Sequence, residues 1–352
     1  MKLGISSHAL RLSGGIERYA MDLVDGFNQL GIKPVFFAKR FDRSLPVYQG
    51  VEAQRINVRW LPNFLRDVWF ARCLVGLQRQ AGIDLMIGCN RVRTADIAIC
   101  GGTHLGFMRS TGKKATLKDR MHIQLEREHY AHARLVVAHS QAMQQELEED
   151  YGISAQKIRV IYPPSSATRF KPVSDAERQR LRKELGWPAD RVIFAFPSSS
   201  HERKGLPALA RFFAETDLPV TLAVVGRPLP QQWRNVQYLG YHTDIERVYQ
   251  AADFTVLASL YEPFGLVGIE SVLCGTPALL ATNIGCAEVL DHRAQINFGA
   301  TDSASLTAAI EQAVARVNAG LARVEQPGSH ISYATDTRHH AQALLNAWAE
   351  VV

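Results

Sequence analysis

Glu262 and Glu270 are the residues of this chain whose type and spacing point most directly to chemistry. Seven residues separate them in the run YEPFGLVGIESVLCGTPALLAT, which contains no Lys or Arg. A solvated pair of surface acids is the common alternative, but Glu is seldom placed among apolar residues without a partner. The run predicts a loop that passes into a helix near Phe264, and the free amides at a helix start favour an anion. The spacing therefore predicts a phosphate seat, with Glu262 in the loop and Glu270 placed to accept hydrogen bonds from ribose hydroxyls.

This run resembles the Glu-x7-Glu signature of the retaining glycosyltransferases of family 4. The resemblance implies an α/β chain with the GT-B fold, in which two Rossmann-like domains face each other across a cleft. It also implies that Glu270 binds the ribose of a nucleotide and that the catalytic Glu262 lies by the donor sugar. The amides implied to hold the diphosphate are those of Phe264, Gly265, Leu266 and Val267.

A glycine pair near the N-terminus is a second candidate contact with phosphate. In RLSGGIERYAMDL, Gly14 and Gly15 precede a helix that we expect to begin near Ile16. Residues without a Cβ atom let the backbone approach a ligand closely, although a glycine pair more often marks a turn. The pair follows the first strand, where ligands bind in open α/β sheets, and it resembles the family's glycine loop facing the donor diphosphate.

Two cations form a third candidate element. Arg203 and Lys204 come directly after the strand VIFAF and before a helix expected near Leu206. Two cations there balance the charge of a diphosphate leaving group, whereas the plain alternative is a pair of exposed basic residues. Lys204 matches a Lys-Gly step of the family, while the family's Arg lies further upstream, where this chain has serines. Arg203 is the nearest substitute.

Three further residues follow strands. Gly226 and Tyr241 stand where strands end, on the side where the family holds the nucleobase, although glycine after a strand is ordinary turn chemistry. His104 follows the strand DIAIC in GGTHLGF. A histidine there is structural or, as in some relatives, lies near the donor sugar, and the sequence leaves both interpretations open.

The length of 352 residues exceeds what one hydrophobic core usually supports, so two domains are expected. Strands alternate with helical stretches, which predicts doubly wound sheets. The segment PPSSATRFKP, from Pro163 to Pro172, has the composition of a linker. We expect residues 1–165 to form an acceptor-binding Rossmann-like domain, residues 166–335 to form a nucleotide-sugar-binding one, and residues 336–352 to form a helix that packs back toward the first domain.

Localisation and cofactors are predicted from what the sequence lacks. It has no apolar run long enough to span a bilayer and no signal-peptide core, which predicts a cytoplasmic protein. Its five cysteines have neither C-x-x-C nor metal spacing, so we expect reduced thiols. No Asp-x-Asp pair indicates a divalent metal. We therefore expect no metal and no cofactor, with the nucleotide-sugar donor as co-substrate.

Positive charge is concentrated in the first half of the chain. Residues 1–165 carry 23 Lys and Arg against 15 Asp and Glu, and the remainder is slightly acidic. Such a half attracts nucleic acid, anionic lipid or a phosphorylated substrate, and the absence of a nucleic-acid motif ranks the first low. Two segments stand out. Arg59 to Gln80 mixes basic residues with apolar ones, and Met108 to Arg120 is a basic segment in an expected loop. Two interpretations stay open for each segment. The first is membrane-facing or an ordinary half-buried helix, and the second is membrane-facing or a solvated loop.

The order of short motifs along the chain looks most like the glucosyltransferases of the inner lipopolysaccharide core, the WaaG type. That resemblance implies transfer of a hexose from a UDP-hexose to a lipid-linked glycan acceptor, at the inner face of the cytoplasmic membrane. A phosphorylated acceptor would explain the basic first half, although GGTHLG lacks an acid that those enzymes carry. Retention without a clear enzymic nucleophile favours attack by the acceptor on the face that the phosphate leaves. A sugar-nucleotide epimerase of the same architecture and a non-catalytic nucleotide-sugar-binding protein remain as alternatives.

Overall fold

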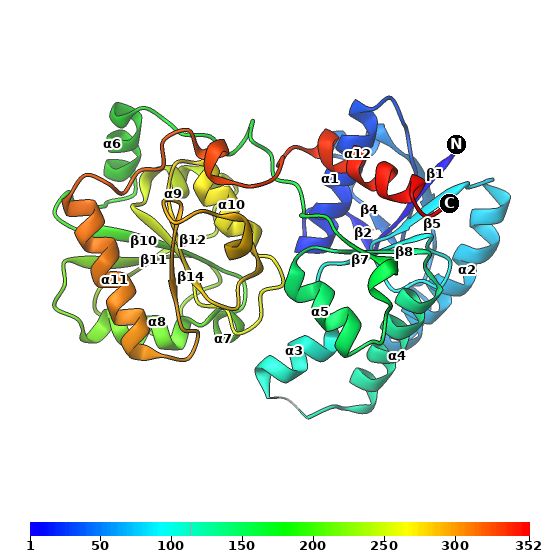
Figure 1. Cartoon of the computed structure of the whole chain (residues 1–352), viewed down its shortest axis with the longest axis horizontal. Coiled ribbons are helices and arrows are strands. Elements are labelled where there is room, and N and C mark those ends of the chain that lie inside the picture. The colour runs from blue at the N-terminus through cyan, green and yellow to red at the C-terminus, as the bar shows by residue number, and fades with distance from the viewer. Residues whose placement is uncertain (113) are drawn as a thin grey trace. The chain divides into compact units, whose positions relative to one another are not determined.

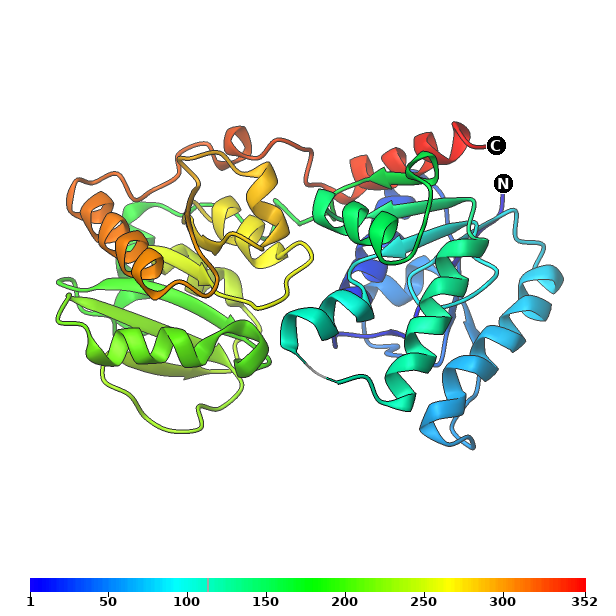
Figure 2. The same ribbon diagram turned by 60° about the horizontal axis from the view of Figure 1, so that its bottom comes forward.

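The structure is a computed structural model that describes residues 1–112 and 114–352, with the side chain of Phe64 left out. The chain divides into two compact units, one of residues 1–164 with 334–352 and one of residues 165–333. In each unit, helices cover both faces of a parallel sheet (Figures 1 and 2). The predicted fold class of two doubly wound α/β domains is therefore confirmed. Within the described residues, none of the helices combines the length and the apolar character that a bilayer span requires.

The N-terminal unit contains a parallel sheet of seven strands in the order β5-β3-β1-β6-β7-β8-β9. Its central strands are buried on both faces, as parallel sheets between helices usually are. Two two-residue strands, β2 and β4, pair beside it. The strands are β1 (Leu3–Ser6), β2 (Ala9–Leu10), β3 (Val35–Ala38), β4 (Arg40–Phe41), β5 (Glu52–Arg55), β6 (Leu85–Gly88), β7 (Ile97–Cys100), β8 (Leu135–Ala138) and β9 (Ile158–Val160).

The helices of this unit follow the apolar periodicity of the sequence. Helix α1 buries Ala20, Leu23, Val24 and Phe27, which the sequence predicts to share one face. Helix α2 buries few residues, but Phe70 is one of them, so this aromatic ring is not available to a membrane. The helices are α1 (Gly15–Gln29), α2 (Arg66–Gln80), α3 (His104–Thr111), α4 (Leu117–His132), α5 (Gln141–Glu149) and α12 (Thr337–Ala349), with 3-10 turns at Pro46–Gly50, Asn63–Leu65 and Ala155–Lys157.

The C-terminal helix α12 packs along α1 (Figure 1). Gly26 lets the two helices approach closely, since a Cβ atom at this position would lie only 2.1 Å from the carbonyl oxygen of Thr337. The hydroxyl of Tyr19 lies 2.8 Å from Nε2 of His340, and Nδ1 of His340 lies 2.9 Å from the carbonyl oxygen of Tyr162. Burial lowers the pKa of His340 to about 4, so the imidazole is neutral at pH 7. A neutral ring both donates and accepts, which satisfies both contacts.

The C-terminal unit contains a parallel sheet of six strands in the order β12-β11-β10-β13-β14-β15. Its strands are β10 (Val192–Ser198), β11 (Val220–Gly226), β12 (Val236–Gly240), β13 (Phe254–Leu257), β14 (Ala278–Ala281) and β15 (Gln295–Phe298). Its helices are α6 (Asp175–Glu184), α7 (His201–Lys204), α8 (Leu206–Glu215), α9 (Ile245–Ala251), α10 (Leu266–Leu273) and α11 (Ser303–Asn318), with 3-10 turns at Gly285–Val289 and Pro327–His330.

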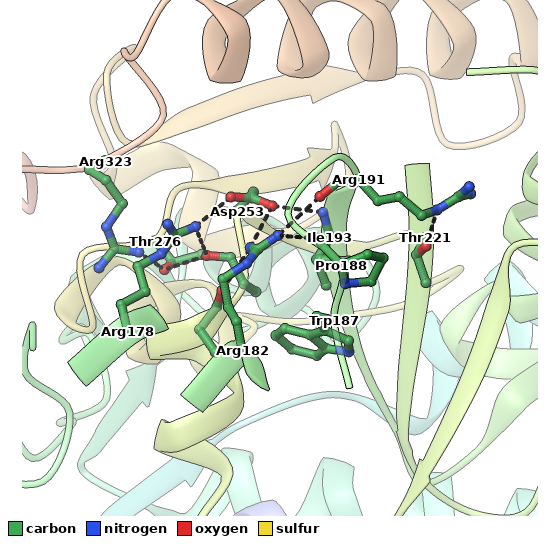
Figure 3. Close-up of polar contacts among 12 residues, drawn as sticks. Arg178, Arg182, Trp187, Pro188, Arg191, Ile193, Thr221, Asp253, Thr276 and Arg323 are labelled. Carbon is green, nitrogen blue, oxygen red and sulfur yellow. Dashed lines mark hydrogen bonds and ion pairs between the residues drawn. The ribbon is translucent and has the colours of Figure 1, made fainter. Parts of the chain in front are cut away.

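A buried ion network joins α6 to the amino ends of the strands in this unit (Figure 3). Oδ2 of Asp253, directly before β13, accepts hydrogen bonds from Arg182 (3.0 Å) and from the amide of Ile193 (2.8 Å). Its other oxygen accepts from Arg178. Arg182 also donates to three backbone carbonyls. The network therefore lies at the amino ends of the strands. Ligands in this class of fold bind at the opposite edge, by the carboxyl ends.

Candidate active site

The predicted donor residues of the C-terminal unit lie at the carboxyl ends of neighbouring strands. The short helix α7 follows β10 and carries Arg203 and Lys204, while the loop after β13 carries Glu262. Strands β10 and β13 are paired neighbours, so their carboxyl ends meet at one edge of the sheet. The topology thus brings together residues that are 58 and 59 positions apart in the sequence.

The carboxylate of Glu262 is held by two cations and a hydroxyl. It pairs with Nζ of Lys204, lies 3.5 Å from the Arg203 guanidinium and accepts a hydrogen bond of 3.1 Å from Ser259. Its side chain is 15% exposed. Burial raises the pKa of Glu262, but Lys204, Arg203 and Ser259 outweigh burial and hold it below its usual value. The group is therefore an ionised, positioned carboxylate that remains partly accessible.

The turn between Glu262 and α10 is fixed by close backbone contacts. Gly265 has a φ of +91°, a conformation that favours glycine. A Cβ atom at Gly285 would lie 2.1 Å from the carbonyl oxygen of Pro263, and the amide of Cys286 donates to the carbonyl of Phe264 at 2.6 Å. The 3-10 turn Gly285–Val289 therefore packs directly against the loop before α10, and these contacts fix the start of that helix.

The start of α10 has the character of an anion seat. Its N-cap residue, Gly265, has no side chain, and the structure describes no side-chain hydrogen bond capping this helix. Leu266 and Val267 in its first turn are half-buried, whereas Phe264 is buried and packs edge to face on Tyr333. A helix start without a side-chain acceptor leaves amides for a ligand, and the helix dipole favours negative charge there. The helix begins two residues later than predicted because Gly265 is left-handed.

Glu270 lies further along α10 and is half-buried. The buried hydroxyl of Tyr249, on α9, forms a hydrogen bond with it. Burial, followed by this carboxylate, raises the pKa of Tyr249 well above its usual value, so the phenol stays protonated and donates a hydrogen bond to Glu270. One oxygen of Glu270 is thus oriented from the neighbouring helix, and a carboxylate has several more acceptor positions for a ligand.

Gly226 and Tyr241 stand at the carboxyl ends of β11 and β12, two neighbouring strands at one side of the sheet. Gly226 ends β11 with a φ of +115°, and a Cβ atom there would lie 2.5 Å from the carbonyl oxygen of Ser198, at the end of β10. Tyr241 directly follows β12 and is 75% exposed. Both residues therefore lie at the same edge of the sheet as Glu262.

The other predicted site residues, Gly14, Gly15 and His104, lie in the N-terminal unit. Gly14 is the exposed N-cap of α1, for which no side-chain cap is described, and Gly15 begins the helix. His104 begins α3, where its Nε2 lies 2.8 Å from Oδ1 of Asp119 and its amide donates to Glu126 at 2.9 Å. The side chain of His104 is 17% exposed. The imidazole is therefore oriented by a carboxylate, which is compatible with both a structural and a functional role.

Sequence reasoning missed two partners of the carboxylate pair. Ser259 lies three residues before Glu262, at the end of a strand, so a Ser-x-x-Glu spacing was available as a weak signal. Tyr249 carried no signal, because its contact with Glu270 depends on how α9 packs against α10. The five cysteines are free thiols. Among the described residues, no group of three or more His, Cys, Asp or Glu side chains is placed to hold a metal ion. A metal-independent reaction stays a prediction.

Comparisons with known proteins show the family of this chain. Residues 13–169 match the model of Glycosyltransferase Family 4, and residues 190–316 match that of Glycosyl transferases group 1. The chain is 49% identical over 353 residues to a protein of Burkholderia thailandensis named probable transglycosylase, covering 99% of this chain and 97% of that protein. The chain belongs to the family 4 glycosyltransferases, and it is a glycosyltransferase.

Solved structures of low sequence identity share the fold. WaaG, a glycosyltransferase involved in lipopolysaccharide biosynthesis, superimposes with a TM-score of 0.77 at 16% identity, covering 99% of this chain and 98% of WaaG. Sucrose-phosphate synthase of Thermosynechococcus elongatus gives a TM-score of 0.80 at 19% identity, with the same coverage. HepE of Anabaena in complex with UDP and glucose gives 0.77 at 19% identity, covering 99% of this chain and all of HepE. These similarities establish the GT-B fold.

Proposed function

We propose that this glycosyltransferase moves a hexose from UDP-hexose to a lipid-linked glycan acceptor of the cell envelope, such as lipopolysaccharide core, with retention and without a metal. The observation that carries the donor half of this proposal is the carboxylate of Glu262, held by Lys204 and Arg203 near the start of α10. The two cations exceed the one carboxylate by a single positive charge. A diphosphate leaving group supplies the negative charge that this arrangement lacks.

Each donor residue has a distinct role in this proposal. The amides at the start of α10, from Phe264 to Val267, hold the diphosphate, and Lys204 and Arg203 take up its charge as the bond to the sugar breaks. Glu270 accepts hydrogen bonds from the ribose hydroxyls. Gly226 and Tyr241 border the nucleobase. The HepE structures that contain UDP and UDP-glucose support a uridine nucleotide.

The proposed reaction occurs on one face of the sugar. The bond between the anomeric carbon and the diphosphate oxygen breaks, and the acceptor oxygen forms a new bond to that carbon from the same side. The acceptor proton passes to the departing phosphate oxygen, so no enzymic base is required. Glu262, ionised at neutral pH, orients the sugar and stabilises the positive charge that develops on it. The role of His104, whose imidazole is oriented by Asp119, stays a prediction.

A panel of sugar nucleotides tests the proposed donor. A UDP-hexose at 100 times its Kd is expected to stabilise the protein by about 2.7 kcal/mol and to raise its melting temperature by several degrees. The donor should be consumed only slowly until an acceptor glycolipid is added. The measurements are thermal shift and product analysis for each nucleotide, with Lys204→Met as the variant that loses the shift. Conversion of the sugar without an acceptor would instead identify an epimerase, and binding without turnover would identify a binding protein.

The proposed membrane contact rests on an exposed apolar patch around the start of α2. Trp60 is 64% exposed, and its ring meets that of Trp69 edge to face at 5.3 Å. Leu65 and Val68 are also exposed, and Arg59 and Arg72 flank the patch. Trp and Arg side chains suit the headgroup region of a bilayer. We propose that this protein is cytoplasmic and that the patch binds peripherally to the inner face of the membrane. The second segment includes Lys113, which lies outside the described residues.

Vesicle flotation tests this contact. The double variant Trp60→Ser, Trp69→Ser is expected to lose most of its binding to vesicles that contain anionic lipid, because the interfacial rings are removed. The matched control is Leu321→Ser, an equally exposed apolar residue of the other unit, which should float as the unmodified protein does. Flotation that the double variant leaves unchanged would show that this patch is not the contact.

A further inference from the structure

A second group of ionisable side chains lies at the carboxyl ends of the strands in the N-terminal unit. His8 follows β1, Lys39 follows β3 and Arg91 follows β6, while Asp67 lies in the first turn of α2. Glu126 reaches the same edge of the sheet from α4, and so does His122. We call these six residues the edge cluster: His8, Lys39, Asp67, Arg91, His122 and Glu126.

Ion pairs organise the edge cluster. Lys39 pairs with Asp67, and Nδ1 of His8 lies 3.3 Å from Nζ of Lys39 and 3.8 Å from Oδ1 of Asp67. Arg91 donates to Oε1 of Glu126 from two nitrogens, at 2.7 and 3.1 Å. Asp67 also acts electrostatically on Arg91, which places the two pairs close together. Except for the buried Glu126, the paired side chains keep between 13% and 33% of their surface exposed.

The charges of the edge cluster cancel. Lys39 and Arg91 carry two positive charges, and Asp67 and Glu126 carry two negative ones. Burial, followed by Lys39, lowers the pKa of His8. Burial, followed by Arg91, lowers the pKa of His122, so both rings are neutral at pH 7. The edge cluster therefore has no net charge to attract an anion, in contrast with the surplus positive charge around Glu262.

The neighbouring helix start is also closed to anions. The first amide of α3, at His104, donates to the carboxylate of Glu126 at 2.9 Å. The amide of Leu105 is 3.5 Å from the hydroxyl of Tyr151, and that of Gly106 donates to Thr103 at 2.9 Å. These three amides are thus taken by groups of the protein itself. A phosphate at this place would have to displace a buried carboxylate, which costs far more than it returns.

We propose that the edge cluster is the subsite for the sugar that accepts the transferred hexose, and that it takes an uncharged polyol ring rather than a phosphorylated one. Vicinal hydroxyls both donate and accept, and the cluster offers both partners. Lys and Arg carry three and five donors, more than these ion pairs use, and carboxylates accept at several positions. The ion pairs hold these groups in place before the ligand arrives, which lowers the entropy cost of binding.

This inference rests on the proposed function, and it revises one expectation of the sequence. The excess positive charge of the N-terminal unit suggested a phosphorylated acceptor, but the edge cluster is neutral. Arg59, Arg72, Lys114 and Lys118 are instead exposed basic residues outside the cluster, where phosphates of a lipid surface are the suitable partners. The acceptor ring and the anionic headgroups therefore contact different parts of this unit.

Saturation-transfer NMR on the full chain tests the proposal with methyl α-glucoside, methyl α-mannoside and myo-inositol as uncharged probes. Glucose 6-phosphate and inorganic phosphate are the anionic probes, added with UDP at saturation so that neither occupies the proposed donor site; inorganic phosphate has no carbon-bound protons and is detected only by competition. At least one uncharged probe should bind the unmodified protein, and inorganic phosphate should not compete with it. Asp67→Asn removes the carboxylate that compensates the charge of Lys39, so the uncharged probe should bind at least about tenfold more weakly. In the same variant, the anionic probes should begin to bind.

Two further variants keep this test interpretable. Glu128→Gln removes a carboxylate from an Arg pair on the outer side of α4 and should change neither kind of binding. Lys39→Met combined with Asp67→Asn restores neutrality and should lose the polyol without gaining phosphate. Competition of inorganic phosphate with the polyol on the unmodified protein overturns the proposal, as does polyol binding that Asp67→Asn leaves unchanged. Stabilisation by UDP-hexose reports the proposed function separately. A protein that binds the nucleotide but none of the polyols refutes this inference alone.

Discussion

Glu262→Gln is expected to lower the rate of hexose transfer at least about 100-fold while nucleotide binding persists. The substitution keeps the size of the side chain and removes its charge, so the sugar loses the carboxylate that stabilises its developing positive charge. Lys204 and Arg203, which pair with Glu262, are released at the same time. Their charge then becomes fully available to a diphosphate, so the affinity for UDP should stay equal or increase.

Initial rates of transfer and UDP affinity, measured on the same preparation, separate these two effects. The matched control is Glu202→Gln on α7, an exposed acid beside Arg203, which should leave both quantities unchanged. A transfer rate that Glu262→Gln does not lower would refute a role at the sugar. A parallel loss of UDP affinity would show that Glu262 acts only by positioning the two cations.

The sequence predicted the fold and the segments of the donor site because both depend on local patterns. Alternating strands and helices imply parallel sheets, and the carboxyl ends of neighbouring strands must meet at one edge. This places Arg203, Lys204 and Glu262 at one edge without any knowledge of side-chain conformations. The ion pairs between them were not predictable in the same way. They depend on the rotamers of side chains that are 58 and 59 residues apart.

The same limit applies to the charges of the N-terminal unit. Counting residues correctly finds an excess of Lys and Arg, but a count does not say which cations already have a partner. Lys39 and Arg91 are paired with Asp67 and Glu126, residues that lie 28 and 35 positions away. Net charge therefore describes the surface of the unit better than it describes the subsite at the sheet edge.

Helix α10 links the candidate site to the far edge of its sheet. Its start is supported by the 3-10 turn that follows β14, and Arg323 holds its end by donating to the carbonyl of Cys274 at 3.0 Å and to Thr276 at 2.6 Å. A cation at a helix C-terminus complements the helix dipole, whose positive end lies at the predicted phosphate seat. Contacts within this unit therefore hold α10 at both of its ends.

Asp253→Ala is expected to lower the free energy of unfolding by about 3 to 5 kcal/mol. The carboxylate of Asp253 compensates Arg182, whose side chain is 7% exposed, and Arg178 (Figure 3). It also accepts from the amide of Ile193 at the start of β10. Removing it leaves the buried guanidinium group of Arg182, the half-buried one of Arg178 and one amide without this partner. Such a loss is a large fraction of the total stability of a domain of this size.

Urea denaturation followed by circular dichroism measures this effect. The matched control is Asp217→Ala, which breaks an Arg-Asp pair whose side chains are 58% and 94% exposed, and which should change the stability by less than about 1 kcal/mol. A loss below that value in Asp253→Ala would mean that water or neighbouring groups compensate the arginines. The triple change Asp253→Leu, Arg182→Met, Arg178→Met should recover part of the lost stability, because it removes the uncompensated charges but leaves the Ile193 amide and the carbonyls that Arg182 contacts without these partners.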